Sequence, residues 1–372
     1  MYYVGMMSGT SLDGVDAVLA RCQNDRWQVI QHAEKPFPDD LKQTLYDLNF
    51  ADTDHTRRGG ELHTAKTAEQ QLTACYAEVF HQLIAAIAPT HIQAIGAHGQ
   101  TIRHQPNARC PYTLQLLNGA LLSHLTGQTV VCDFRSKDIA AGGQGAPLAP
   151  LFHQHLFAQQ PPFAVVNIGG IANISIVGGN TSSVPLSGFD CGPGNCLLDE
   201  WVSRHCGKAF DKNGQWAAGG QVLPELLWRL LSDDYFAQPA PKSSGRDYFN
   251  TRWLQRYLHA DEAPQDVMRT LLELTAKAIT DNLPDGLNAV ILAGGGAKNH
   301  LLVQTIEANL SLSEKTAHCP RLLCSDELGI GAQQVEALGF ALLAKQCLSG
   351  EPMPTQQVTG ATTPVICGAI YR

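Results

Sequence analysis

Short hydrophobic runs that end at turn residues recur along the chain, and longer segments with an amphipathic pattern lie between them. Apolar runs of this length, bounded by glycine or other turn residues, are typical of buried β-strands that lead into tight turns. We predict a strand at each of the runs YYVG, IQAIGAHG, TVVCDF, FAVVNIGG, NISIVGG and NAVILAGGG.

Two of the segments between these runs carry an apolar stripe at helical spacing. The first, residues 64–87, is predicted to end before Pro89, because proline disfavours helix at the residue that precedes it. The second, residues 267–283, is predicted to end at Pro284 and Gly286. Strands that alternate with helices in this way predict an α/β architecture.

The order of the predicted elements suggests two domains. The segments VDAVLARCQ and RWQVIQHAEKPF continue from the first run as a β-meander, so the N-terminal sheet should be mixed. A second strand–glycine–strand unit, FAVVNIGGIANISIV, follows a crossover that we place near residues 135–150, and 372 residues exceed what one core usually supports. The last helix and the run PVICGAIYR should return to the first domain. The predicted domains are therefore residues 1–135 with about 340–372, and residues 136–339.

Composition narrows the class of partner. The net charge is −8 and the basic residues are scattered, which argues against nucleic acid or an anionic membrane and favours a small ligand. No apolar run approaches the roughly 20 residues that span a bilayer, and the N-terminus lacks the pattern of a secretion signal, so we expect a cytoplasmic protein. The 11 cysteines are odd in number and contain no Cys-x-x-Cys pair, so we expect reduced thiols and no zinc site.

The polar turn SGTSLDG, residues 8–14, directly follows the first run. Glycines expose backbone N–H groups at close range and hydroxyl side chains add donors, so such a turn can surround a phosphate. It is neither a Walker loop, since no Gly-Lys-Ser/Thr follows, nor a G-x-G-x-x-G that opens a helix. Taken alone, an ordinary hairpin turn is the simpler interpretation.

Two further glycine turns strengthen the phosphate hypothesis. NIGGIANIS has the same strand–turn–strand pattern, and LAGGGAKNHLL ends a strand and starts a helix whose N–H groups could meet a ligand. Together the three turns resemble the two phosphate loops and the adenosine loop of the superfamily that includes actin, the ATPase domain of heat-shock chaperones and sugar kinases. That resemblance implies two similar ribonuclease H-like domains with mixed sheets flanked by helices, and ATP bound in the cleft between them. The implied nucleotide contacts are Gly9, Thr10, Ser11, Leu12, Asp13, Gly14, Val15, Asp16, Asn167, Gly169, Gly170, Gly294, Gly295, Gly296 and Asn299.

The same superfamily holds the magnesium of the nucleotide with acidic residues beside its phosphate loops. The resemblance therefore implies that Asp13 or Asp16 holds Mg²⁺ through water, since hard cations prefer carboxylate and water oxygens. Either aspartate could equally cap a turn.

Six motifs stand in an order that identifies a family within this superfamily. They are GMMSGTSLDGVDAVL, AHGQTIRH, DFRSKDIAAGGQGAPLAP, NIGGIANIS, GFDCGPGN and AGGGAKNHLL. Over nearly its whole length the chain resembles the anhydro-N-acetylmuramic acid kinases, and the combination of SGTSLDG, GGQGAPL and FDCGPGN is specific. The resemblance implies a homodimeric enzyme of bacterial cell-wall sugar recycling. It would open the 1,6-anhydro ring with water and phosphorylate O6 with ATP, giving N-acetylmuramate 6-phosphate and ADP. The alternatives are a kinase for another hexosamine and a nucleotide-dependent interaction module.

The predicted catalytic residue is Asp190 in SGFDCGPGN, which matches the position of the family's general base. Gly192, Pro193 and Gly194 should form a rigid loop of small residues that lets the sugar approach. The alternative for Asp190 is a turn cap. Asp133 is the rival base, because in simpler sugar kinases the base precedes the second phosphate loop. With Asp190 as the base, Asp133 and Arg135 are expected to orient the base or the substrate.

Further polar residues are candidates for binding the sugar. His98, Gln100 and Thr101 lie at a predicted strand end, where they could contact the sugar or simply satisfy a turn. Gly192 and Asn195 flank the predicted base, and Glu336 lies on an otherwise apolar helix where a carboxylate needs a partner. Arg246 and Asp247 in SSGRDYF either form an ion pair or frame the cleft mouth.

Overall fold

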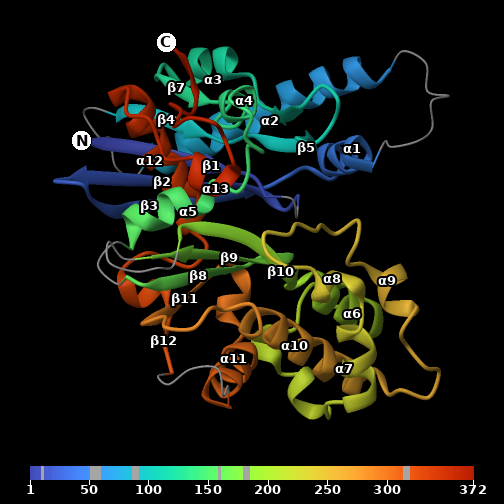
Figure 1. Cartoon of the computed structure of the whole chain (residues 1–372). Helices are drawn as coiled ribbons and strands as arrows, with labels where there is room; N and C mark the ends of the chain where they lie inside the picture. Colours follow the sequence, from blue (N-terminus) through green and yellow to red (C-terminus); the bar gives the residue numbers. More distant parts are fainter. Residues whose placement is uncertain (10–11, 51–59, 86–91, 158–160, 179–184, 313–318) are drawn as a thin grey trace. The chain divides into compact units, whose positions relative to one another are not determined.

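The computed structural model describes residues 1–9, 12–50, 60–85, 92–157, 161–178, 185–312 and 319–372. It divides the chain into two compact units, drawn in Figure 1. The first unit comprises Met1–Leu156 and Gln334–Arg372, and the second comprises Phe157–Gln333.

The two crossings between the units differ from the predicted boundaries. The chain leaves the first unit after Leu156, not near residue 135, and returns at Gln334. Helices α4 (Ser136–Ala140) and α5 (Ala149–Leu156) stay with the first unit because they are bonded and packed to its C-terminal part. The buried carboxylate of Asp138 in α4, for example, accepts a 2.8 Å hydrogen bond from Thr359 Oγ1. A stretch rich in glycine and proline therefore marks a tightly held loop here and not the linker.

The sheet of the first unit is mixed, as predicted. Its strand order is β13-β7-β4-β1-β2-β3. The three N-terminal strands form an antiparallel meander, β4 and β7 extend the sheet in parallel from β1, and β13 closes its edge in the antiparallel sense. The bounds are β1 (Tyr2–Met7), β2 (Gly14–Gln23), β3 (Arg26–Pro36), β4 (Ile92–Ala97), β7 (Val130–Cys132) and β13 (Ala369–Tyr371).

The sheet of the second unit repeats this arrangement. Its order is β10-β9-β8-β11-β12, with β8, β9 and β10 antiparallel and with β11 and β12 added in parallel beside β8. The bounds are β8 (Phe163–Ile168), β9 (Ile171–Val177), β10 (Ser187–Pro193), β11 (Ala289–Ala293) and β12 (Arg321–Cys324). Both units thus place a meander and then parallel strands in the same spatial order, which confirms the predicted pair of similar α/β units.

Helices cover both faces of the first sheet. Helix α2 carries Leu72, Tyr76 and Phe80 into the core beneath β1 and β2, and α12 packs on β1 and β4 at the other face. The approach of α12 is close, because a side chain at Gly5 or Gly96 would overlap the backbone of that helix. The remaining elements of this unit are α1 (Asp39–Phe50), α2 (Glu61–Ala85), α3 (Gly119–Thr126), α12 (Val335–Ser349), α13 (Gln356–Thr359) and the hairpin β5 (Gln100–Gln105) with β6 (Tyr112–Leu116).

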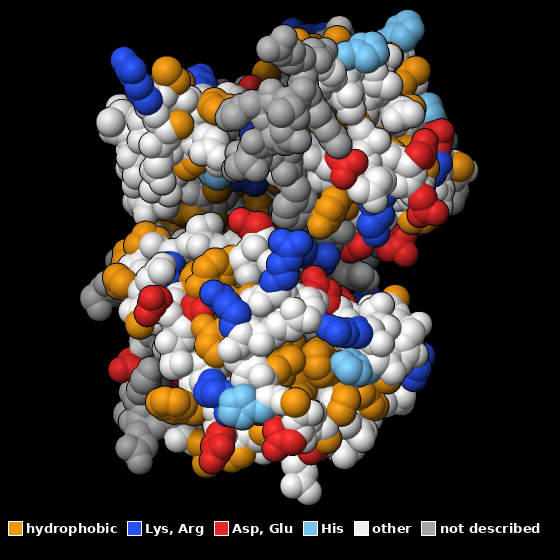
Figure 2. All heavy atoms as spheres, turned by 90° about the vertical axis from the view of Figure 1, so that its right-hand side faces the viewer, with side chains coloured by type: hydrophobic (Ala, Val, Ile, Leu, Met, Phe, Trp, Pro, Cys, Tyr) orange, Lys and Arg blue, Asp and Glu red, His pale blue; other side chains and the backbone are white. Residues whose placement is uncertain are grey.

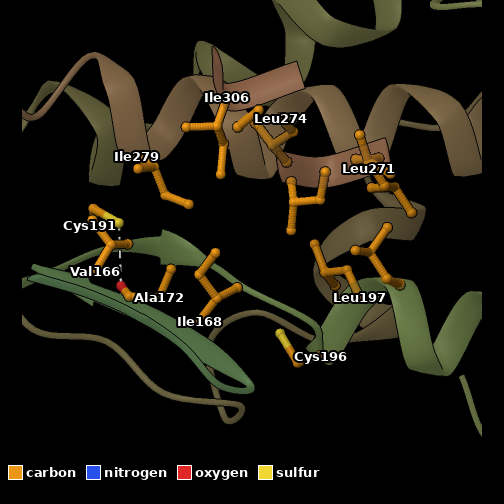
Figure 3. Packing of buried hydrophobic residues seen from close by; sticks show 14 of the residues in the cluster. Val166, Ile168, Ala172, Cys191, Cys196, Leu197, Leu271, Leu274, Ile279 and Ile306 are labelled. Atoms are coloured by element: carbon orange, nitrogen blue, oxygen red, sulfur yellow. Dashed lines mark hydrogen bonds between the residues drawn. The ribbon is translucent and has the colours of Figure 1, made fainter. Parts of the chain in front are cut away.

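The core of the second unit lies between its sheet and helices α10 and α11. Figure 3 shows Val166, Ile168 and Ala172 facing Leu274 and Ile279 of α10 across this core. The predicted helix 267–283 is observed as α10 (Pro264–Thr280), which starts with a proline in its first turn. The other helices are α6 (Cys196–Cys206), α7 (Pro224–Leu231), α8 (Asp234–Ala237), α9 (Thr251–Gln255) and α11 (His300–Leu312), with short 3₁₀ turns at Lys212–Gly214, Ala217–Gly219, Gly295–Lys298 and Ser325–Leu328.

The distribution of surface charge and the state of the cysteines match what the composition predicts. Basic and acidic side chains lie interspersed on the face drawn in Figure 2. All eleven cysteines are free thiols. Within the described ranges, no helix is both long enough and apolar enough to cross a bilayer. The predicted helix end at Ile87 and Pro89 lies outside the described residues.

The close approach of α12 to the sheet predicts a stability effect at Gly96. A methyl group there would overlap Phe340 O and lie 2.9 Å from the Ala344 side chain, so Gly96→Ala should lower the free energy of unfolding by about 1–3 kcal/mol. Urea denaturation followed by circular dichroism measures this loss. Gly60→Ala is the matched control, since among the described residues, its chain neighbours aside, no atom lies within 4 Å of the added methyl. Equal stability of the two variants would contradict the packing described here.

Candidate active site

Asp190 lies within a strand, and the strand sets the direction of its side chain. Its neighbours Phe189 and Cys191 are both buried in the core of the second unit, so the alternation of β10 turns Asp190 to the opposite face. Figure 3 shows Cys191 in that core, where its Sγ donates a 3.2 Å hydrogen bond to Ala172 O. The position of Asp190 is therefore fixed by regular sheet structure.

The prediction that Gly192, Pro193 and Gly194 form a loop is wrong for the first two of these residues. Gly192 and Pro193 belong to β10, and a bulge interrupts the pairing with β9 between Asp190 and Gly192. A side chain at Gly192 would come within 2.9 Å of Ala278 Cβ on α10. Close packing against this helix accounts for the glycine, because any larger residue would push α10 away from the strand.

Only one oxygen of the Asp190 carboxylate accepts hydrogen bonds from described residues. Oδ2 accepts hydrogen bonds from the Ser244 N–H at 2.9 Å and from Ser243 Oγ at 3.2 Å. Oδ1 has no hydrogen-bond partner in the described part of the chain. The backbone is fixed as well, because the Asp190 N–H donates to Lys242 O at 2.9 Å and its carbonyl accepts from Tyr235 Oη at 2.7 Å. The carboxylate is thus oriented while one oxygen stays available to a ligand.

The surroundings of Asp190 favour the protonated form of its carboxyl group. Burial raises the pKa of this carboxyl above its usual value, and the hydrogen bonds from Ser244 and Ser243 offset part of that rise. A carboxylate with a raised pKa accepts a proton more readily, which is the property that general-base catalysis near neutral pH requires.

A buried carboxylate anchors the segment that holds Asp190. Asp233 accepts hydrogen bonds from Tyr248 Oη at 2.6 Å, Tyr257 Oη at 2.7 Å and Trp253 Nε1 at 2.8 Å, and from the Tyr235 N–H at 3.0 Å. Burial alone would raise its pKa, but these four donors lower it below the usual value. The segment between α8 and α9, which contains Ser243 and Ser244, is fixed at both ends by this carboxylate.

The second glycine turn is bonded directly to the residues that follow Asp190. The carbonyl of Gly169 accepts from the Asn195 N–H at 2.8 Å, and the carbonyl of Gly170 accepts from the Gly194 N–H at 2.9 Å and the Cys196 N–H at 3.0 Å. The Asn195 side chain adds a 3.1 Å bond from Nδ2 to Ile168 O. The turn and the segment that follows Asp190 therefore belong to one hydrogen-bonded structure.

The third glycine turn lies beside the second. Strands β8 and β11 are parallel neighbours, so their carboxyl ends reach the same edge of the sheet. Gly294 has φ +80°, and a side chain on it would overlap Asn167 Oδ1. Gly295 is more open, with Asn195 Nδ2 as the nearest atom at 3.9 Å from a would-be Cβ, and a side chain on Gly296 would overlap Ile168. The structure thus brings the predicted nucleotide residues of the second unit together at one edge.

Asn299 has a structural task in the same region. Its Oδ1 accepts a 3.3 Å hydrogen bond from the Leu302 N–H in the first turn of α11, and its own N–H donates to Gly296 O at 3.0 Å. The side chain therefore caps this helix.

The first glycine turn is described only in part. Thr10 and Ser11 lie outside the described residues, while Gly9 O accepts a 3.2 Å bond from the Leu12 N–H. Leu12 and Val15 are buried in the core of the first unit, so only their backbone groups can meet a ligand. Leu12 also has φ +58°, a left-handed conformation that is strained for a residue with a branched side chain.

Gly14 and the two aspartates complete this turn. A side chain at Gly14 would overlap Lys35 O on β3, which explains the glycine by strand approach. Asp13 is exposed and lies 3.7 Å from Lys42 Nζ. Asp16 is half-buried, 3.4 Å from His32 Nε2, and clusters with His32 and Glu34. The carboxylate oxygens of Asp13 and Asp16 fit a hard cation such as Mg²⁺, whereas the imidazole beside Asp16 does not.

His98 is held neutral in the first unit. Arg135 Nε donates a 3.0 Å hydrogen bond to His98 Nε2, so the ring proton resides on Nδ1, which faces Gly99 O at 2.9 Å. Burial and the charge of Arg135 lower the pKa of His98 to about 3. Because both ring nitrogens are occupied, this side chain positions Arg135 and is not a base.

Arg135 interacts with two other predicted sugar-binding residues, His98 and Glu336. Its Nη1 donates to Gly145 O at 2.7 Å, within the motif GGQGAPL. Burial lowers its pKa to about 10, and the negative charge of Glu336 on α12 opposes that shift. The structure therefore gathers His98, Arg135 and Glu336 into one cluster of the first unit, with a guanidinium that stays charged at neutral pH.

Gln100 carries an unsatisfied polar atom and Thr101 does not. The Oε1 atom of the fully buried Gln100 has no hydrogen-bond partner in the described part of the chain, which is costly unless a ligand supplies a donor. Thr101 Oγ1 accepts a 3.2 Å hydrogen bond from Gln115 Nε2.

The rival base, Asp133, serves as a cap. This exposed residue has φ +52°, and its Oδ1 accepts a 3.2 Å hydrogen bond from the Ser136 N–H at the start of α4. An aspartate tolerates this left-handed conformation better than most residues, so the turn accounts for its side chain.

Comparison with known proteins identifies the family. The sequence profile of the anhydro-N-acetylmuramic acid kinases matches residues 1–372. The anhydro-N-acetylmuramic acid kinase of Nitrosospira multiformis is 47% identical over 377 residues, with 100% of this chain and 98% of the relative covered. That of Neisseria gonorrhoeae is 43% identical over 376 residues, with 99% and 98% covered. Among solved structures, a ROK family glucokinase from Streptomyces griseus in complex with glucose and AMPPNP is 13% identical, with a TM-score of 0.46, and 93% of this chain and 100% of that chain are covered.

The chain belongs to the anhydro-N-acetylmuramic acid kinase family.

Sequence reasoning missed several residues that shape the site of this kinase. Ser243, Ser244 and Tyr235 contact Asp190 from positions more than forty residues away in the chain, and nothing in the sequence pairs them with it. Asp138 accepts a 2.7 Å bond from the Gly145 N–H, which shapes the loop that Arg135 binds. Asp138 lies in the motif DFRSKDIAAGGQGAPLAP, and that motif is the sequence signal that could have found it.

The geometry around His98 predicts the absence of a titration. Its imidazole should show no protonation step between pH 5 and pH 8, since its pKa is lowered to about 3, and its Nδ1 should carry the proton. Nitrogen-15 NMR of histidine-labelled kinase measures both properties, and a His98→Gln variant assigns the signal. A midpoint near the ordinary value of 6.5 would show that the contact with Arg135 is not formed in solution.

Proposed function

We propose that this kinase couples the hydrolysis of a 1,6-anhydro ring to phosphorylation. Its substrates are 1,6-anhydro-N-acetylmuramic acid, water and ATP, and its products are N-acetylmuramate 6-phosphate and ADP. The observation that carries the proposal is the Asp190 carboxylate, which is oriented through one oxygen while the other has no partner among the described residues. The residues that follow Asp190 are hydrogen-bonded to the second glycine turn. The family to which the chain belongs supplies the class of sugar.

The proposed reaction uses Asp190 as the single base. Its available oxygen removes a proton from a water molecule as that water attacks the anomeric carbon. The C1–O6 bond breaks, its electron pair stays on O6, and O6 attacks the γ-phosphorus of ATP while ADP leaves. The leaving group of the ring opening is thus the nucleophile of the phosphoryl transfer, so O6 needs no second base.

The remaining candidates divide into two groups in this proposal. The backbone of the three glycine turns binds the nucleotide phosphates and adenosine, and Asp13 and Asp16 hold Mg²⁺ through water. When bound, this ion neutralises charge on the phosphates. In the first unit, the Arg135 guanidinium, the Glu336 carboxylate and the unsatisfied Gln100 Oε1 provide hydrogen-bonding groups for the sugar. A cytoplasmic location, expected from the sequence, and a homodimer, implied by the family resemblance, belong to the same proposal.

Removing the base tests the proposal. Wild-type kinase incubated with ATP and 1,6-anhydro-N-acetylmuramic acid should form the 6-phosphate. Asp190→Asn should lower kcat by about 10²–10⁴-fold, because the amide cannot accept the proton, while the affinities for nucleotide and sugar stay close to those of the wild type. Mass spectrometry of the product and calorimetric titration measure the two effects.

Asp133→Asn separates the two candidate bases in the same assay. An asparagine can still cap α4, so this variant should lose far less activity than Asp190→Asn. A loss confined to Asp133→Asn would move the base to the other unit. A loss of binding and turnover in equal measure at Asp190 would mark that residue as structural.

A further inference from the structure

The guanidinium of Arg246 lies against the second glycine turn and has no hydrogen-bond or ion-pair partner among the described residues. Arg246 follows the SSG segment, and a Cβ on Gly170 would lie 2.7 Å from its Nε and 2.9 Å from its Nη2. The Nε atom is buried and has no hydrogen-bond partner in the described part of the chain. A methyl group at position 170 would therefore displace this guanidinium.

Arg246 differs from the other half-buried arginines of its unit, Arg229 and Arg269. Those two lie beside the carboxylates of Glu262 and Glu273. Arg246 forms no such ion pair among the described residues, and the neighbouring Asp247 does not pair with it. The predicted ion pair between these two is thus not observed, and the guanidinium has donors to offer to another group.

The groups around Arg246 form a site for an anion. The carbonyls of Gly169 and Gly170 are taken by Asn195, Gly194 and Cys196, whereas the N–H groups of the two glycines have no partner in the described ranges. Helix α6 begins at Cys196. The positive charge of Arg246 opposes the burial that raises the pKa of the Cys196 thiol, so the guanidinium also lies close to this helix start. A cation, two unpaired backbone donors and a helix N-terminus together favour a negatively charged ligand.

Arg246 is also tied to the base by a short segment. Ser244, two residues earlier, donates its N–H to Asp190 Oδ2 at 2.9 Å. The same few residues therefore orient the carboxylate and place the guanidinium on the glycine turn. Any movement of this segment would displace both groups together.

We propose that Arg246, with the N–H groups of Gly169 and Gly170, binds the phosphoryl group that is transferred from the nucleotide. This inference rests on the proposed function, since it assigns a further catalytic residue to the same reaction. Guanidinium groups bind phosphate oxygens in a bidentate manner, and an arginine at the transferring phosphoryl stabilises the charge that spreads over its oxygens. Arg246 itself forms and breaks no covalent bond. The acid group of the sugar is the other anion that a guanidinium could bind, and the experiment separates the two.

The test compares Arg246→Met and Arg246→Lys with a matched control. Arg246→Met should lower kcat by about 10²–10³-fold, with a KM for the sugar near that of the wild type. By calorimetry, its affinity for a non-hydrolysable ATP analogue should fall while its affinity for ADP stays nearly unchanged, because only the analogue carries the third phosphate. Arg246→Lys should recover part of the loss. Arg252→Met, on an exposed residue of α9, should behave as wild type.

Gly170→Ala gives a second route to the same displacement. Its methyl group would push the guanidinium aside. Like Arg246→Met, the variant should therefore show a lower kcat and a smaller preference for the ATP analogue over ADP. In the Arg246→Met background the further loss should be small, because the two substitutions remove one interaction. This variant also keeps the inference testable if Arg246→Met does not fold.

Each other outcome has one meaning. Wild-type turnover in folded Arg246→Met overturns the inference, as does a rise in the KM for the sugar alone, which would assign the guanidinium to the acid group of the sugar. If wild-type kinase forms no sugar phosphate, the proposed function fails. The comparison of ADP with the ATP analogue still decides the role of Arg246 in that case.

Discussion

The alternation of strand β10 is the constraint on which the site depends. Phe189 and Cys191 are committed to the core beneath α10, so Asp190 between them must face the other way. The bulge that follows, and the glycine that packs on Ala278, allow the strand to continue into the segment that binds the second glycine turn. The burial of its neighbours thus orients the Asp190 carboxylate within the fold before any ligand binds.

Each unit contains a buried group of hydrogen-bonded side chains that sets the protonation of one candidate residue, Asp190 in the second unit and His98 in the first. In the second unit, Asp233 gathers four donors and thereby fixes the segment that hydrogen-bonds Asp190 Oδ2, while burial leaves Asp190 with a raised pKa. In the first unit, Arg135 keeps His98 neutral by donating a hydrogen bond to its Nε2. The negative charge of Glu336 favours the charged form of the Arg135 guanidinium. A group can accept a proton only where a lone pair remains available. Among the described residues Asp190 Oδ1 meets this condition, whereas both ring nitrogens of His98 are occupied.

The sequence predicted features that depend on local pattern. The apolar runs gave six strands of the two sheets, and the meander of β1, β2 and β3 followed from the short segment between hydrophobic runs. Strand β10 was missed because its glycines and proline resemble a loop, although Phe189 and Cys191 carry the period of two. The cap at Asp133 and the burial of Leu12 accompany positive φ angles at these two residues, which the sequence pattern does not predict. The contacts of Ser244 and Arg246 join residues far apart in the chain, so only the folded structure reveals them.

The origin of the oxygen on C1 of the product tests the central claim most directly. The reaction is run in water enriched in oxygen-18, and the sugar phosphate is fragmented by mass spectrometry, with unlabelled product incubated in the same water as the control for slow exchange. Our account predicts one labelled oxygen at C1 and an unlabelled oxygen between C6 and phosphorus, because O6 comes from the anhydro bond. Product with no label at C1 beyond the exchange control, or with label in the bridge to phosphorus, would contradict it.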